Sequence, residues 1–123
     1  MNYYEHHIGD YAQATAHLSF LEDAAYSRLL RKYYAEERPL PSDLRSVQRL
    51  IGARSEDERE AVEVVLQEFF RLEQDGWHNS RADDEIARFQ SKRAMARKSA
   101  EARWGARGSP ERQGRNANAC AND

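Results

Sequence analysis

The sequence predicts a mainly α-helical protein with one small β-hairpin, a winged-helix (helix-turn-helix) domain followed by a basic C-terminal helix and a disordered tail. Three segments with helical spacing of apolar residues follow one another, and each is preceded by a capping residue. Asp75-Gly76 then separates two short runs, which is a strong hairpin signal. Helix, extended link, helix, helix and hairpin is the order of a winged helix. We expect this domain in residues 1–90, a basic helical arm in 91–104 and the tail in 105–123.

The N-terminal segment, residues 2–16, is aromatic and polar and lacks helical spacing. We therefore expect it to be extended, with a turn at Gly9-Asp10, and to lie over the core.

The first predicted helix follows Ser19, which forms a capping-box pattern with Glu22. It should run to about Glu37, because Pro39 disfavours the helical region for the residue before it. Its apolar residues at helical spacing are Leu21, Ala25, Leu29 and Tyr33, with Tyr26 and Leu30 beside them.

Two further helices follow the extended link at residues 39–41. Ser42 or Asp43 should cap the second, which ends at Gly52. Ser55 should cap the third, in the position of a recognition helix. The expected buried residues are Leu44, Val47, Leu50 and Ile51 on the second helix and Val62, Val65, Leu66, Phe69 and the adjoining Phe70 on the third.

The hairpin and a fourth helix complete the domain. We expect Leu72 and Trp77 to face the core from the two strands. A fourth helix should begin near Arg81, and its last large apolar pair is Ile86 and Phe89. Beyond this pair the chain favours helix but has little to bury, and an isolated helix of this kind is marginal in water.

Charge is distributed unevenly beneath a formal net charge of −2. Residues 55–90 contain four Arg and eleven acids, whereas residues 91–123 contain eight Lys or Arg and three acids. A folded acidic body with a basic arm suggests that the arm binds a polyanion. The expected DNA-binding residues of the arm are Lys92, Arg93, Arg97, Lys98, Arg103 and Arg107, with Trp104 available to stack on a base or sugar edge.

The third helix has the wrong charge for reading bases in the usual way, because its exposed face would carry carboxylates. That face contains Glu56, Asp57, Glu60, Glu63 and Gln67. Arg45 and Arg49, spaced i, i+4 on the second helix, could instead contact phosphates, although most such surface arginines are solvated or paired with acids. The arm could equally be a solubilising tail whose Trp104 docks on the body.

Several classes of protein are disfavoured. The single Cys120 excludes an internal disulfide, and there is neither a long apolar run nor a signal peptide, so we expect a cytoplasmic protein. No histidine or cysteine spacing is typical of a metal site. We expect no catalytic residues, no metal, no cofactor and no small-molecule substrate.

The chain resembles the YdaU family, also called domain of unknown function 1376, over roughly residues 3–104. The ordered words that carry the resemblance are GDYAQATAHLS, EDAAYSRLLRKYY, PLP, VLQEFF, DGWHNSRADDE and EARW. The resemblance implies a winged-helix module similar to the N-terminal regions of phage replication initiators, and a setting in prophage or phage replication. It implies no defined biochemical activity.

These observations predict an accessory DNA-replication protein that binds DNA without catalysis, chiefly through the arm. One alternative is a protein-interaction module that recruits a replisome or regulatory partner through the acidic helix or an exposed aromatic patch. The other is a transcription regulator, which the acidic third helix disfavours.

Overall fold

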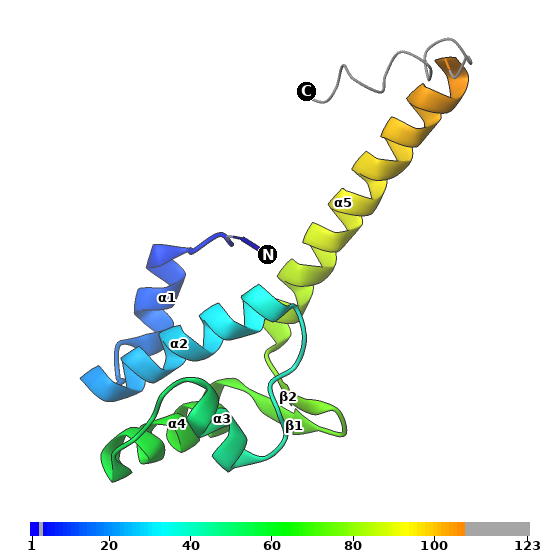
Figure 1. Ribbon diagram of the computed structural model, residues 1–123. Coiled ribbons are helices and arrows are strands. Elements are labelled where there is room, and N and C mark those ends of the chain that lie inside the picture. Colours follow the sequence, from blue (N-terminus) through cyan, green and yellow to red (C-terminus); the bar gives the residue numbers. More distant parts are fainter. Residues whose placement is uncertain (3, 108–123) are drawn as a thin grey trace, which may run out of the picture. The chain divides into compact units, whose positions relative to one another are not determined.

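The computed structural model describes residues 1–2 and 4–107 and is mainly helical with a small β-hairpin, as predicted (Figure 1). The chain divides into two compact units, Met1–Ile86 and Ala87–Asp123, which are described separately below. The predicted division after residue 90 stays a prediction. The elements are α1 (Ile8–Thr15), α2 (Phe20–Glu36), α3 (Leu44–Leu50), α4 (Glu56–Phe69), β1 (Arg71–Glu73), β2 (Gly76–His78) and α5 (Ser80–Arg107).

The helix starts predicted from capping residues are confirmed. Both α2 and α4 begin with a complete capping box, in which the serine oxygen accepts the N3 amide and the N3 glutamate accepts the serine amide. The pairs are Ser19 with Glu22 and Ser55 with Glu58. Of the two candidates for α3, Asp43 is the cap, and its carboxylate accepts the amide of Ser46 at 3.0 Å.

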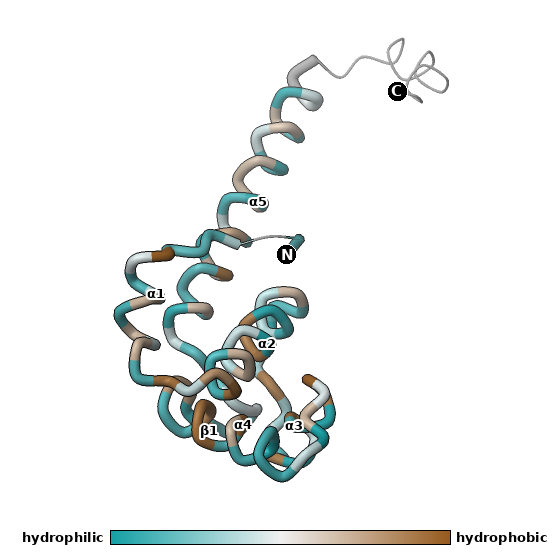
Figure 2. The backbone as a smooth tube through the Cα atoms, turned by 90° about the vertical axis from the view of Figure 1, so that its left-hand side faces the viewer, coloured by the Kyte–Doolittle hydropathy of each residue, from teal (hydrophilic) through white to brown (hydrophobic). Residues whose placement is uncertain are grey.

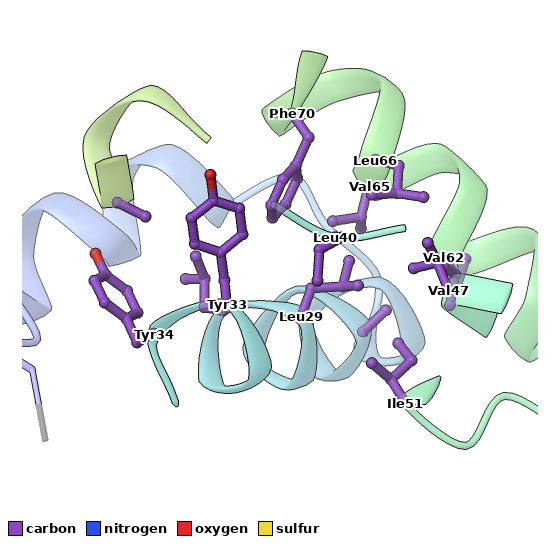
Figure 3. Packing of buried hydrophobic residues seen from close by; sticks show 14 of the residues in the cluster. Leu29, Tyr33, Tyr34, Leu40, Val47, Ile51, Val62, Val65, Leu66 and Phe70 are labelled. Carbon is purple, nitrogen blue, oxygen red and sulfur yellow. The ribbon is translucent and has the colours of Figure 1, made fainter. Parts of the chain in front are cut away.

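The core of the first unit forms where α2 packs on α4. Leu29 and Tyr33 on α2 are fully buried against Val65 and Leu66 on α4, and Val47 of α3 closes one side (Figure 3). Most of the apolar residues at helical spacing thus form the core, as the sequence predicts, but Leu21 and Leu50 are 39% and 37% exposed, so the expectation that Leu50 is buried is wrong. Phe69 is only half-buried, whereas the adjoining Phe70 is buried.

The hairpin is confirmed, and Leu40 adds a third backbone partner to it. Leu40 and Trp77 exchange two backbone hydrogen bonds of 3.0 and 2.9 Å. Gly76 pairs with Glu73 and therefore opens β2, rather than sitting in the turn. A Cβ at Gly76 would lie 2.0 Å from the Leu40 carbonyl oxygen, and the residue has a φ of 132°. Glycine is needed here because only its backbone can approach so closely.

The expectation of an extended N-terminal segment is wrong, because residues 8–15 form α1. The Tyr11 hydroxyl donates to Asp23 at 2.6 Å, and its ring stacks on Tyr26 with centroids 5.6 Å apart. Both partners lie on α2, so contacts with a distant segment select a helix that the local pattern did not indicate.

The expectation that Leu72 faces the core is also wrong: it is 54% exposed. Its cross-strand partner Trp77 is half-buried and packs against the core, as predicted. The difference arises because β2 lies between Leu40 and β1. Leu72 is therefore on the outer strand, beyond the reach of the core, while the buried Leu40 takes the inner position.

Helix α5 starts beside a buried asparagine and continues further than expected. The Asn79 side chain accepts the amide of Ala82 at 2.9 Å and donates to the Phe69 carbonyl at 3.1 Å. Gly105 lies within the helix, so the predicted disorder is wrong for residues 105–107. The remainder of the predicted tail, with Cys120, lies outside the described residues. Within the described residues, no helix has the length and apolar character needed to cross a membrane.

Candidate nucleic-acid interface

The part of α5 in the second unit is a cationic, exposed helix. Between Ala87 and Arg107 it carries seven Lys or Arg and one Glu. Every side chain from Gln90 to Ser99 is exposed, and Trp104 is 59% exposed. Of the predicted arm residues, those with described side chains are all exposed: Lys92, Arg93, Arg97, Lys98, Arg103 and Trp104. Arg107 is the last residue of the helix, and its side chain is outside the described part.

Local propensity accounts for this helix better than packing does. Ala, Arg, Lys, Glu and Gln dominate it, and these residues lose little conformational freedom in a helix. The Arg93 guanidinium lies 5.5 Å from the centroid of the Phe89 ring, one turn away. In Figure 2 hydrophilic and weakly hydrophobic residues alternate along α5. The helix therefore presents charge in several directions rather than one apolar face.

Such a helix can bind a polyanion electrostatically. With a rise of about 1.5 Å per residue, the part from Ala87 to Arg107 is roughly 30 Å long. Its cations could contact several phosphates in succession, and counterion release would favour association with nucleic acid. Phosphate contacts carry no sequence information, so this surface is suited to binding without sequence preference.

Arg45 and Arg49 of the first unit are both exposed on α3, one helical turn apart. The structure therefore brings these two predicted contacts together on one helix. Hydrogen bonds from Ser46 hold the pKa of the nearby Asp43 carboxyl below its usual range, and Arg49 and Arg45 add to this effect. Neither arginine has an ion pair among the described residues, so both remain available to phosphate.

Helix α4 presents the acidic face that the sequence predicts. All five expected residues are exposed: Glu56, Asp57, Glu60, Glu63 and Gln67. Glu58 instead turns back to accept the amides of Arg54 and Ser55, and these bonds lower the pKa of its carboxyl. A DNA phosphate near this face would be repelled, so α4 is a poor base-reading helix despite its position in the chain.

Sequence reasoning missed a cationic groove between α2 and α3. Its lining residues are Arg28, Arg31, Lys32, Ala35, Leu50 and Ile51. Spacing at i, i+3 and i+4 already places the three cations on one side of α2. The position of α3 against that side could not be found from spacing, because it depends on tertiary packing.

A second missed feature is a hydrogen-bonded group around His78. Its Nδ1 lies 2.9 Å from Asp83 Oδ2, and its Nε2 lies 2.7 Å from Asp75 Oδ1. Hydrogen bonds to Asp83 and Asp75 raise the pKa of this imidazole. The Tyr33 hydroxyl also donates to Asp83, which joins the group to the core, and burial with this bond raises the tyrosine pKa.

Two groups of side chains in the described residues have ligand atoms close enough to hold a metal ion, although no metal site was predicted. They are Glu5, His7 and Glu85, and Glu73, Asp75 and His78. In the second group the hydrogen bonds that His78 makes with Asp75 and with the neighbouring Asp83 account for the geometry without a metal.

Comparison with known proteins places the chain in an uncharacterised group. The family profile described as "Protein of unknown function (DUF1376)" matches residues 2–87. The uncharacterized protein YdaU of Escherichia coli (strain K12) is 34% identical over 99 residues, which are 80% of this chain and 33% of that protein. The chain thus spans about a third of the length of this relative. No solved structure matches this chain significantly.

Proposed function

This chain belongs to the DUF1376 family of proteins of unknown function, and we propose that it is a non-enzymatic DNA-binding protein of the winged-helix type. Its DNA contacts are made chiefly by the cationic part of α5 and assisted by Arg45 and Arg49. The observation that carries the proposal is the exposure of Lys92, Arg93, Arg97, Lys98 and Arg103 on the part of α5 in the second unit, which buries almost nothing. The cellular setting that fits is accessory DNA replication of a phage or prophage in the cytoplasm.

The order of elements supports the winged-helix assignment. Helices α2, α3 and α4 are followed directly by the β1–β2 hairpin, which corresponds to the wing. Leu40, between α2 and α3, pairs with Trp77 of β2 through an isolated bridge and so joins the wing to the helices. In this arrangement α4 takes the recognition position. Its acidic face is the reason why we assign the main DNA contacts to α5 instead.

The test is fluorescence anisotropy of the full chain with random duplex and single-stranded oligonucleotides over a salt series. Four glutamine substitutions, K92Q, R93Q, R97Q and K98Q, should flatten the slope of log affinity against log salt by about three to four, because each phosphate contact contributes about 0.9. Removal of all residues after Phe89 should weaken binding at least as much. Unchanged affinity in both variants would refute a role for the arm.

A protein-interaction function is favoured by a different observation, the exposed carboxylates of α4. In this case a basic surface of a replisome or regulatory protein would bind Glu56, Glu60 and Glu63. The substitutions E56Q, E60Q and E63Q should then abolish recovery of the partner after nuclease digestion, while leaving DNA affinity unchanged or slightly increased. Recovery that is lost on nuclease treatment would instead show that DNA bridges the two proteins.

A further inference from the structure

The groove between α2 and α3 in the first unit has an unbalanced charge. It is an open groove of about 320 Å³, lined by Arg28, Arg31, Lys32, Ala35, Leu50 and Ile51. Three of these six residues are cationic, and no carboxylate lines the groove. Leu50 is 37% exposed at its edge and gives the wall an apolar part. The lining therefore offers positive charge beside a small apolar surface.

The three cations differ in how they are held. Arg28 Nη1 donates to the Ile51 carbonyl at 2.9 Å, which fixes the guanidinium at the end of α3. Lys32 Nζ lies 3.8 Å from Glu36, whose carboxylate also pairs with Arg38 at 3.0 Å. Arg31 makes no hydrogen bond or ion pair with the described residues and is exposed. Arg31 thus has no carboxylate partner among the described residues, whereas Lys32 pairs with Glu36 and Arg28 is close enough to Glu58 to help lower the pKa of that carboxyl.

Structural roles explain only part of this arrangement. A cation near the C-terminal end of a helix binds its last carbonyls, which accounts for Arg28. Arg31 and Lys32 have no such role, and each lies one turn from Arg28, where like charges destabilise a helix by a few tenths of a kcal/mol. A bound anion would remove this repulsion.

We propose that the groove between α2 and α3 binds a phosphate of the DNA backbone. Arg31 has the free donors that a bidentate phosphate contact requires, Arg28 is already oriented, and Lys32 adds a point charge. Leu50 would then lie against the adjacent sugar. This inference rests on the proposed DNA-binding function but assigns a second contact surface to the body. The body would approach DNA with its α2–α3 side.

The full chain carrying R31Q and K32Q tests this assignment in the same anisotropy experiment. Loss of this one phosphate contact should flatten the slope of log affinity against log salt by about one, equally for all duplex sequences. The matched control carries R54Q and R81Q, which change the net charge equally at exposed positions that do not line the groove. Circular dichroism confirms that both variants are folded. A slope that does not change, or that changes as much in the control, overturns the proposal.

Two further measurements separate the groove from the arm and DNA from small phosphates. If neutralising Lys92, Arg93, Arg97 and Lys98 leaves affinity unchanged while R31Q and K32Q reduce it, the arm proposal fails and the groove proposal stands. If both sets reduce affinity, each surface contributes. A pyrophosphate titration should shift the Arg31 side-chain NMR signal only weakly. Saturation by pyrophosphate with no response to duplex would show that the groove takes a free phosphate compound, contrary to our assignment.

Discussion

Residues 29–34 of α2 and residues 92–98 of α5 are both helical and both contain adjacent cations, yet they use them differently. In α2 the cations Arg31 and Lys32 lie between the buried pairs Leu29-Leu30 and Tyr33-Tyr34, so one side of the helix is core and the other is surface. In α5 every residue from 92 to 98 is exposed. A helix that contributes to the core must satisfy packing, whereas an exposed helix can be selected for charge alone.

The comparison predicts that the two regions respond very differently to loss of an apolar side chain. Leu66→Ala should lower the free energy of unfolding by about 2–5 kcal/mol, because Leu66 is fully buried and its truncation leaves a cavity. Met95→Ala should change it by less than about 0.5 kcal/mol, since Met95 is 67% exposed. Urea denaturation followed by circular dichroism measures both. A comparable loss for Met95→Ala would show that the arm is packed.

A backbone substitution in the hairpin should have the next largest effect. Gly76→Ala places a methyl group against the Leu40 carbonyl and forces a strained φ, at a cost of about 1–3 kcal/mol. Gly105→Ala in α5 is the matched control, because nothing lies within 4 Å of its Cβ position. It should be neutral or slightly stabilising in thermal denaturation, since alanine favours helix. Equal melting temperatures for wild type and Gly76→Ala would contradict the close approach.

Loss of a helix cap should cost less, about 1 kcal/mol. Ser55→Ala removes the oxygen that accepts the Glu58 amide at 3.1 Å at the start of α4. Ser99→Ala, on the exposed face of α5, serves as the control and should not reduce stability. Chemical denaturation measures the free energy of unfolding of both variants. A loss in Ser55→Ala but not in Ser99→Ala would show that the cap at the start of α4 stabilises the fold, whereas the exposed serine of α5 does not.

The smallest expected effect is a dependence of stability on pH. The pKa of His78 is raised in the folded state, so its charged form stabilises the fold fully below its unfolded pKa of about 6.5. This contribution, below about 1 kcal/mol, should be lost as pH rises through the higher folded pKa. His78→Gln should remove that part of the pH profile. NMR titration of the imidazole would contradict the prediction if its pKa lay at or below 6.5.

Local chemistry was sufficient to predict much of this fold. Both capping boxes, the buried stripes of α2 and α4 and the hairpin follow from interactions over a few residues, and the structure confirms them. The exposed cations of the arm and the exposed acids of α4 were also predictable, because a segment without apolar periodicity has nothing to bury. The DNA-binding role of these cations stays a prediction.

The remaining features depend on partners far away in the sequence. The segment around Tyr11 is helical because Tyr11 donates a hydrogen bond to Asp23 and stacks on Tyr26. Leu72 is exposed because Leu40 occupies the inner position beside β2. The Arg28–Lys32 groove exists only because the end of α3 packs beside α2. The sequence by itself determined where α2, α3 and α4 start, most of the residues that they bury and how charge is divided between residues 55–90 and 91–123. Only the tertiary structure decided which surfaces meet, since such contacts join elements whose separation along the chain carries no local signal.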